Sequence, residues 1–578
     1  MSVSSGSSGF GGDSLNSNAY GSSTFMSRQQ ANDACLPNYK PEAGSIAVAT
    51  FADGTIACIN QAGHLTVIAP ARSGKGIGIL IPNAALYRNG SFVGVDLRGE
   101  VAAMMTRYRQ RLGQKVINID PAGVLKRYGI EPEIIAQGFD PVTHILCGGD
   151  EKRVLDDIPL LAEAIIPEGG NADKDQHWVE GGRATITLCL TFLAVFCPET
   201  DRNLIALARA VNGIPHSLEK MAGALTNNPH PIPALADVIA RRGAWWAEMN
   251  DRERGSYISM ARRGMRWTNS TIWSDYAGRM DFDPEELATG KLTVFIIVPY
   301  ERLSEYQPFI RMLLTSLIIG AMRGRKETRV PTLMALDEFR AIGKLSIIEQ
   351  SIPVAEGSGL KYLFILQSLD QLEAMFPDKT YHGLIANSAA QVLFNISDQN
   401  TADYASKFMG THSAAVPSGG GISYVSRPLM TPEEVRLLPP DELLLFMRNR
   451  PPARLGKINI LKHEPFKTML AQGVIAPNPL YAPPGAKPQA GPQPRTGILS
   501  LDAALNTAAP VRIDSQAVTA ALESKYPGKE FRLENDQIGF DESWTNPHTG
   551  ETVSAFVAIL HVSLLEPLTK GGSSHHGA

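Results

Sequence analysis

The chain lacks the cysteine pairs and the charge imbalance that would assign it to several broad classes of protein. Its 578 residues include five cysteines, and none of them forms a CxxC pair or stands at a Cys/His metal spacing. This argues against a disulfide framework or a zinc site and favours free thiols in a reducing compartment. The formal net charge is −4, so no global positive field attracts nucleic acid. Any DNA binding therefore requires a local basic patch.

A long apolar run is also missing. The longest candidate, "ATITLCLTFLAVF" at 184–196, is shorter than the roughly 20 residues that a helix needs to cross a bilayer. The N-terminus is rich in Ser and Gly and has no apolar segment of the kind that a secretion signal contains. We therefore expect 184–196 to be a buried helix. We also expect a soluble, cytoplasmic chain without a transmembrane segment.

The stretch "APARSGKG" at 69–76 is similar to a phosphate-binding loop but departs from it twice. The Walker A pattern begins with Gly and has Ser or Thr after its Lys, whereas Ala69 and Gly76 occupy these positions. Gly74 leaves the backbone free to wrap around an anion, and Lys75 stands where a Lys reaches phosphate oxygens. The hydroxyl that usually binds Mg²⁺ is missing at Gly76. This stretch alone leaves both a nucleotide site and a plain strand–turn–helix connection open.

Two further polar groups follow apolar runs. The run "LMALDEF" at 333–339 leads into Asp337 and Glu338, a Walker B form in which Asp supports Mg²⁺ and Glu deprotonates the attacking water. The run "LFILQS" leads into Gln367, an uncharged polar group that can sense the γ-phosphate. Each feature alone is also a common strand end. Together they favour a nucleotide site, because ligands bind at the carboxyl ends of strands in open α/β sheets.

Apolar runs alternate with helix-compatible stretches over much of the chain, which is typical of a parallel sheet with helices on both faces. The predicted strands lie at 64–69, 91–96, 115–120, 292–299, 332–338, 361–367 and 390–396. Strand signals fade between 155 and 280, where Leu/Ala-rich helical spacing predominates. The sequence therefore predicts an α/β fold with a mainly parallel sheet, split by an inserted all-α domain.

Composition sets the remaining boundaries, because Ser/Gly-rich and Pro/Gly-rich segments cannot bury a core. The C-terminal part holds one helix-compatible segment, at 515–526, and a possible pair of strands. The predicted regions are a disordered tail (1–44), the first part of a nucleotide-binding domain (45–154), the inserted all-α domain (155–280), the second part of the nucleotide-binding domain (281–466), a linker (467–510) and a small C-terminal extension of unknown role (511–578).

Several segments between about 65 and 465 resemble the TraG/TraD-like (VirD-type) type IV coupling proteins, in the order in which that family has them. The segments are "APARSGKGIG", "GVDLRGE", "LGQKVINIDP", "ALDEFRAIGKL", "LFILQSLDQLE" and "RPLMTPEEVRLLPPDELLLF". This family commonly has Gly after the Walker Lys, which fits Gly76. The resemblance implies a RecA-like P-loop NTPase that uses ATP and Mg²⁺ and assembles as a homo-hexameric ring.

The resemblance also implies roles for individual residues. Lys75 would bind phosphate, Asp337 would support Mg²⁺, and Glu338 would activate water. Gln367 would read the γ-phosphate. The other implied ATP-binding residues are Ala69, Arg72, Ser73, Gly74, Gly76, Asp96 and Glu100. For the last two, a strand-end cap and a helix N-terminal charge remain an alternative. The family usually completes each site with an arginine from the neighbouring subunit, which the sequence does not place.

The best candidate for a DNA-contacting surface is the stretch 241–267, where arginines are interleaved with aromatic residues. Arginine can meet phosphates, and aromatic side chains can stack on bases. The arginines that we predict to bind DNA are Arg241, Arg242, Arg262, Arg263 and Arg266. The alternative is that the tryptophans of this stretch belong to a helical core, where Trp is more often found, and that the arginines form a solvated face.

The resemblance implies an ATP-hydrolysing coupling protein that recruits a relaxase with single-stranded DNA and delivers it to a type IV secretion channel, as a ring translocase. Family members usually begin with transmembrane helices, and here a polar tail stands in their place. Either the chain is a soluble variant that a membrane-anchoring partner recruits to the inner face of the cell membrane, or it is a truncated form. Two alternatives stay open, namely a coupling ATPase for protein effectors that never moves DNA, and a docking adaptor that does not hydrolyse ATP.

Overall fold

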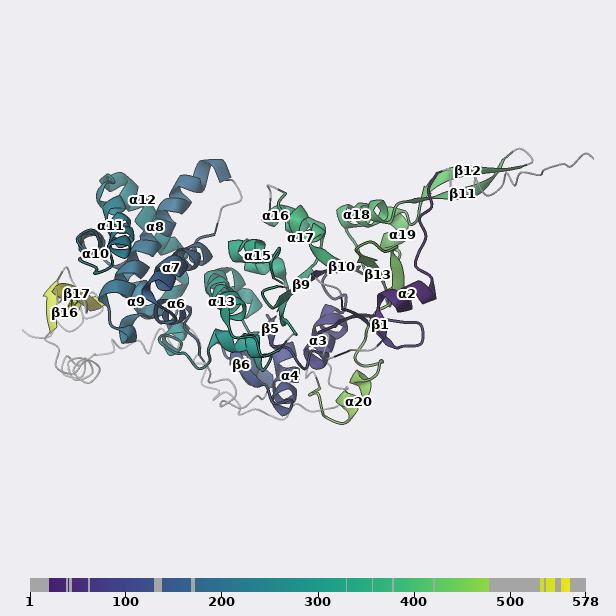
Figure 1. Ribbon diagram of the computed structural model, residues 1–578, viewed down its shortest axis with the longest axis horizontal. Helices are drawn as coiled ribbons and strands as arrows, with labels where there is room; N and C mark the ends of the chain where they lie inside the picture. Colours follow the sequence, from purple (N-terminus) through teal and green to yellow (C-terminus); the bar gives the residue numbers. More distant parts are fainter. Residues whose placement is uncertain are drawn as a thin grey trace, which may run out of the picture.

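The computed structural model describes residues 20–37, 40, 44–60, 63–128, 138–167, 172–328, 330–355, 357–376, 379–418, 421–477, 531–534, 537–545 and 552–561. At its centre lies a 12-stranded sheet flanked by helices. A group of helices stands at one end of the sheet, and the hairpin β11–β12 projects at the other (Figure 1).

The strand order of the central sheet is β1-β3-β2-β14-β13-β10-β4-β9-β8-β5-β7-β6. Neighbours from β10 to β6 pair in parallel, and the remaining strands form an antiparallel extension. The strands are β1 (Leu36–Pro37), β2 (Ile46–Thr50), β3 (Ile56–Ile59), β4 (His64–Ile68), β5 (Phe92–Val95), β6 (Lys115–Ile119), β7 (Leu292–Ile296), β8 (Thr332–Leu336), β9 (Leu360–Leu366), β10 (Ser388–Leu393), β13 (Glu442–Met447) and β14 (Ala453–Gly456). All seven parallel strands coincide with the predicted ones, which confirms the α/β fold class.

Helices cover both faces of the sheet because its parallel strands are apolar on both sides. In β8, Met334 and Leu336 pack in one hydrophobic cluster, and Leu333 and Ala335 pack in the other. Successive side chains of a strand point to opposite faces, so strands buried on both faces appear as continuous apolar runs. The helices of this part are α3 (Ile81–Leu86), α4 (Glu100–Arg111), α13 (Leu303–Arg323), α14 (Phe339–Ile342), α15 (Ser346–Ser351), α16 (Leu369–Met375), α17 (Tyr381–Ala386), α18 (Gln399–Met409), α19 (Pro432–Arg436) and α20 (Phe466–Ala471).

Helices also fill the region that the sequence predicts to be an inserted all-α domain. Within its described residues there is no strand. The helices before and within it are α6 (Pro141–Cys147), α7 (Glu151–Ile165), α8 (Ala172–Phe196), α9 (Leu204–Asn212), α10 (Pro215–Thr226), α11 (Pro233–Ala247) and α12 (Asp251–Gly264). Helix α8 contains the apolar stretch 184–196. Its segment Gln176–Phe196 is long and apolar enough to cross a membrane, but 67% of the most apolar window is buried inside the protein.

The N-terminal segment is more ordered than its composition suggests. Residues 1–19 lie outside the described part, but α2 (Arg28–Ala34) and β1 occupy much of 20–37. Helix α2 begins with a capping box in which Ser27 and Gln30 satisfy each other's backbone N–H groups. Cys35 is buried beside β3, with which β1 pairs. The prediction of disorder through residue 44 is therefore wrong for this segment, because a local cap and a sheet edge hold it.

Three strands form a separate small sheet near the C-terminus, namely β15 (Phe531–Glu534), β16 (Gln537–Thr545) and β17 (Thr552–His561). The sequence predicts only a possible pair of strands there. The helix-compatible segment at 515–526 and most of the linker lie outside the described residues. A further two-stranded sheet is the hairpin of β11 (Thr411–Ser418) and β12 (Gly421–Pro428).

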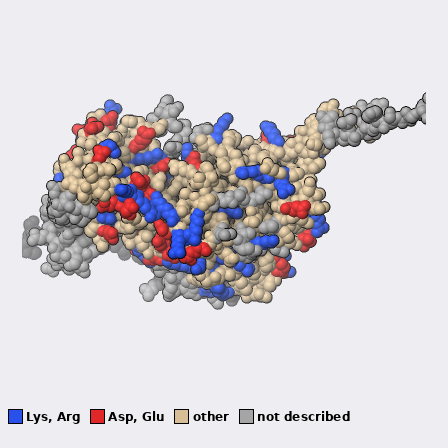
Figure 2. All heavy atoms as spheres, viewed as in Figure 1, with Lys and Arg blue, Asp and Glu red and all other residues tan. Residues whose placement is uncertain are grey.

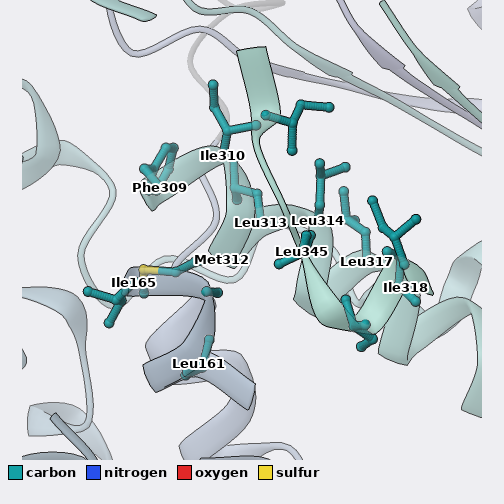
Figure 3. Close-up of a cluster of buried hydrophobic side chains, with 14 of the residues drawn as sticks. Leu161, Ile165, Phe309, Ile310, Met312, Leu313, Leu314, Leu317, Ile318 and Leu345 are labelled. Atoms are coloured by element: carbon teal, nitrogen blue, oxygen red, sulfur yellow. The ribbon is translucent and has the colours of Figure 1, made fainter. Parts of the chain in front are cut away.

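Helix α13 joins the helical region to the sheet. Figure 3 shows its apolar side chains next to Leu161 and Ile165 of α7. Arg311 of α13 is buried there, 2% exposed. Its guanidinium donates to the carbonyls of Ala164 (2.6 Å) and Ile165 (3.3 Å) in the last turn of α7 and to that of Ile342 (3.4 Å), the last residue of α14. These carbonyls have no partner within their own helices, so one buried cation joins two helix C-termini.

We expect Arg311→Met to lower the free energy of unfolding by about 3 kcal/mol, because it leaves buried carbonyls without donors. Urea unfolding followed by circular dichroism measures this change. The matched control is Arg325→Met, at an exposed arginine just beyond the end of α13, which should shift the midpoint little. Equal midpoints for the two variants would contradict the role of Arg311.

Candidate nucleotide-binding site

Four neighbouring parallel strands, β4, β9, β8 and β5, end at the same edge of the sheet. The phosphate-loop sequence follows β4, and Gln367 follows β9. Asp337 and Glu338 follow β8, and Asp96 follows β5. The structure thus brings together residues that are up to 298 positions apart in the chain, at the edge where open α/β sheets bind ligands.

The loop after β4 has the backbone geometry of an anion-binding turn. The N–H of Ala69 donates to Leu366 O of β9 (2.9 Å), which ties the start of the loop to the sheet. Gly74 has a φ of 91°, a conformation that a side chain would strain. A π-helical turn, Gly76–Leu80, then leads into α3. Arg72 is exposed and has a φ of 61°.

Lys75, Glu338 and Gln367 form a continuous chain of contacts. The Nζ of Lys75 lies 3.1 Å from Oε1 of Glu338, and their side chains are 9% and 21% exposed. The Nε2 of Gln367 donates to Oε2 of the same carboxylate at 2.7 Å. Both carboxylate oxygens of Glu338 are therefore bound, one by the loop after β4 and one by the residue after β9.

Glu338 and Asp337 are held in an uncommon backbone turn. Glu338 is left-handed, with a φ of 50°, and its N–H donates to Oδ1 of Asp337 at 3.0 Å. Non-glycine residues at positive φ cluster at functional sites. Burial raises the pKa of Asp337 to about 7, and the negative charges of Glu338 and Asp96 add to the rise while Lys75 opposes it. A cation bound at Asp337 would relieve this concentration of negative charge.

Asp96 and Glu100 lie at the start of α4. Oδ2 of Asp96 accepts from the N–H of Ala102 at 2.8 Å, which closes the first turn of the helix. Burial raises the pKa of Asp96 to about 6, and Glu100 raises it further. Glu100 lies 3.8 Å from the exposed Arg98. These contacts agree with the capping alternative, while the charge of Asp96 still acts on Asp337 at the end of the neighbouring strand.

The loop offers a free hydroxyl and open space to a phosphate group. The Oγ of Ser73 is buried and has no hydrogen-bond partner among the described residues, which leaves one donor and acceptor for a ligand. A Cβ added at Gly76 would meet no heavy atom within 4 Å. There is therefore open space at the position where a Walker A hydroxyl would stand.

Residues 21–479 match the model of a protein family described as type IV secretory system conjugative DNA transfer. The chain belongs to this family. Its members include VirD4- and TraG-type coupling proteins, so the resemblance seen in the sequence is confirmed.

Two curated coupling proteins illustrate the similarity. The chain is 25% identical over 445 residues to Protein VirD4 of Agrobacterium fabrum, which covers 71% of this chain and 63% of that protein. It is 24% identical over 424 residues to conjugal transfer protein TraG of Escherichia coli, which covers 65% of this chain and 62% of that protein. The chain thus spans less than two thirds of the length of these relatives.

Solved structures of a plasmid coupling protein, TrwB, share the fold. The complex of TrwB with ADP and Mg²⁺ aligns with a TM-score of 0.53 and 18% identity over 76% of this chain and 94% of that one. The sulphate complex aligns with a TM-score of 0.56 and 17% identity over 75% and 92%. The chain therefore has the RecA-like P-loop NTPase fold that the sequence predicts for this family.

The arginines that the sequence analysis predicts to bind DNA separate into two groups in the structure. Arg242 donates to Oγ1 of Thr191 and to Leu155 O, both at 2.8 Å, and Arg262 donates to Gly213 O at 2.8 Å. These two side chains hold helices together. The exposed arginines are Arg241, Arg263 and Arg266. The tryptophans Trp246 and Trp267 are 1% and 2% exposed and belong to the core.

One residue at the site was missed by the sequence interpretation. Lys457, directly after β14, donates from Nζ to the carbonyl of Ser73 at 2.7 Å. It stands 384 positions from the loop and in no recognisable motif. Only the strand order, which brings β14 and β13 next to β10 and β4, places it there.

We expect Gly74→Ala and Gly76→Ala to differ in stability. Gly74 is at positive φ, where Ala is strained by about 1–2 kcal/mol. Gly76 is in a helical turn with open space around a Cβ, where Ala is favoured by about 0.5–1 kcal/mol. Thermal unfolding of the nucleotide-free protein should thus rank Gly76→Ala at or above the wild type and Gly74→Ala below it. The reverse order would contradict the loop geometry.

Proposed function

We propose that the protein is an ATP-hydrolysing coupling protein that recruits a relaxase–DNA substrate and delivers it to a type IV secretion channel. The observation that carries the proposal is the chain of contacts from Lys75 through Glu338 to Gln367 at the ends of three adjacent strands. These three residues would serve as the base, the phosphate-binding cation and the polar sensor of the site. Membership of a conjugative DNA transfer family supports the same conclusion.

Lys75 holds Glu338 only while no phosphate competes for it. An ammonium group near a triphosphate exchanges its single carboxylate for several phosphate oxygens, as in P-loop NTPases. This exchange frees Oε1 of Glu338 to accept a proton from the attacking water. Gln367 keeps its hydrogen bond to Oε2, so the carboxylate stays oriented while its other oxygen takes the proton.

The remaining residues of the site suit ATP and Mg²⁺. Backbone N–H groups of the loop around Gly74 and the hydroxyl of Ser73 would hold phosphate oxygens. Asp337 would hold Mg²⁺ through its carboxylate. When bound, the cation neutralises charge on the transferred phosphoryl group. Because Gly76 offers no hydroxyl, Asp337 would be the residue of this site that holds the metal.

Replacing the base tests the proposed chemistry. We expect Glu338→Gln to lower kcat for ATP hydrolysis at least 100-fold, since it removes a general base, which contributes about 10²–10⁴-fold. ATP binding should persist because Lys75 loses its competitor. Steady-state hydrolysis and titration with a fluorescent ATP analogue measure the two effects.

The same assay separates the alternatives when it is run with and without single-stranded DNA. Stimulation by DNA that disappears in Glu338→Gln supports the translocase. Hydrolysis that DNA leaves unchanged favours a coupling ATPase for protein effectors. ATP binding without hydrolysis in the wild type would favour a docking adaptor and contradict the proposal.

Exposed arginines of the helical region are the proposed DNA contacts. Figure 2 shows basic and acidic side chains intermixed over one face of the molecule, so a local site has to supply the attraction. An open groove of about 460 Å³ lies between α8 and α12, with Arg252, Arg263 and Trp178 in its lining. Neither arginine has an ion-pair partner among the described residues. Trp178 is 36% exposed, so it can stack on a base.

We expect the double variant Arg252→Ala/Arg263→Ala to weaken binding of a labelled single-stranded oligonucleotide about tenfold. The slope of log K against log salt should fall by about 1.4, which corresponds to two lost phosphate contacts. Fluorescence anisotropy at several NaCl concentrations measures both. Arg325→Ala, at an exposed arginine outside the groove, is the control. An unchanged salt slope in the double variant would contradict DNA binding in this groove.

We also propose a homo-hexameric assembly, which the family resemblance implies. Ring NTPases place an arginine of one subunit at the site of the next, and the proposed homo-hexamer would supply it through a closed cyclic interface. A membrane-associated partner would bring the ring to the secretion channel at the inner face of the membrane.

A further inference from the structure

We propose that Lys457 is a positioning residue that fixes the orientation of the Ser73–Gly74 peptide, so that its N–H faces the bound phosphate. The inference rests on the proposed nucleotide site and adds to it a residue outside all of its motifs. Lys457 acts through the loop and has no contact with the reacting atoms.

The ammonium group of Lys457 donates to three acceptors. Its Nζ donates to Ser73 O at 2.7 Å, to Oδ1 of Asn395 at 2.7 Å and to Pro440 O at 2.9 Å. It also lies 4.6 Å from the centre of the Phe394 ring. A lysine has three N–H donors, and these acceptors come from the phosphate loop, the end of β10 and the turn before β13. Lys457 therefore joins three separate segments.

The bond to Ser73 O determines where the next N–H points. In a trans peptide the C=O and N–H groups point in opposite directions. With the carbonyl of Ser73 turned to Lys457, the N–H of Gly74 is turned away from it. Gly74 has no Cβ and adopts φ of either sign with similar ease, so sterics alone do not select this orientation. A charge-assisted hydrogen bond does.

A second contact holds the same segment against the loop. A Cβ at Gly78 would come within 2.9 Å of Ile458 O, so the first turn after the loop packs directly on the residue next to Lys457. The backbone N–H of Lys457 donates to Asp441 O at 2.7 Å. The backbone of Lys457 is therefore fixed, and its ammonium group would have to give up its bonds to Asn395 and Pro440 to follow the loop if the peptide turned.

Burial lowers the pKa of Lys457 from its usual value, with the charge of Asp441 opposing the shift. Each of its acceptors is uncharged, being a carbonyl or an amide oxygen. Among the described residues, no carboxylate is bound directly to this cation. Its charge adds to that of Lys75 on the loop and favours an anionic ligand.

The test compares Lys457→Met, Lys457→Arg and Lys462→Met in the full chain. Lys462 is exposed and five residues further along, so its variant is the matched control. We expect Lys457→Met to raise the Kd of a fluorescent ADP analogue roughly tenfold, the effect of one lost hydrogen bond from a charged donor. KM for ATP should rise with it while kcat changes less than threefold. Lys457→Arg should recover part of the affinity, because it retains the charge but not the three-donor geometry.

The melting temperature of the nucleotide-free variants separates positioning from stability. A purely structural role would lower the melting temperature and leave the Kd of the folded fraction unchanged, which would overturn the inference. Equal Kd values for Lys457→Met and Lys462→Met would also overturn it. If Lys457→Met does not fold, Asn395→Gly is used, because glycine suits the φ of 52° at Asn395 and removes one acceptor. It should raise the Kd about two- to fivefold, and an unchanged Kd would again contradict the inference.

A separate titration shows whether the proposed function itself fails. Lys75→Ala should abolish ADP and ATP binding in the parallel titration, since Lys75 is the phosphate ligand of the proposed site. If the wild type binds no nucleotide, the proposed function fails and the role of Lys457 fails with it. If the wild type binds and Lys75→Ala does not, the site stands, and the Lys457 variants alone decide the inference.

Discussion

The contact between Lys75 and Glu338 is the interaction on which the site depends. The two residues belong to loops after β4 and β8, which are separated in the sheet by β9. Their side chains meet only if three parallel strands keep their order and register. Gln367, at the end of the intervening strand, donates to the same carboxylate. This partly buried ion pair, together with the hydrogen bond from Gln367, therefore forms only when the three strand ends are correctly aligned.

This arrangement suits a site that must be stable empty and reactive when filled. Exposed ion pairs contribute about 0–1 kcal/mol, but Lys75 is 9% exposed, and a buried ammonium group without a partner would be costly. Glu338 satisfies it in the empty protein. A phosphate that replaces Glu338 leaves the lysine satisfied and the carboxylate free. In the proposed mechanism the same event that brings the substrate would thus release Glu338 to act as the base, while its positive φ fixes the backbone from which its side chain extends.

The sequence predicted those parts of the structure that have a local signal. The parallel strands are continuous apolar runs, and the polar residues that follow them mark the edge where ligands bind. Other parts depend on long-range contacts and could not be predicted. In the sequence, nothing distinguishes Lys457 from a surface lysine, because only the pairing of β14 with β13 brings it to the loop. Arg242 was predicted to contact DNA, but α11 packs on α7 and α8, and its side chain binds those helices instead. The capping box of Ser27 and Gln30 was a local signal, but the surrounding Ser/Gly-rich composition obscured it.

The fold also limits how the nucleotide site and the helical region can move relative to each other. Helix α14 begins at Phe339, directly after Glu338, and ends at Ile342, whose carbonyl accepts from Arg311. The same guanidinium binds the last turn of α7. If α14 moved away from α7, Arg311 would lose a hydrogen bond while its charge stayed buried, which is energetically costly. We therefore expect α14 and α7 to move together. Glu338 is thereby joined, through α14 and one arginine, to α7, which packs against α8, one of the two helices that line the groove of Arg252 and Arg263.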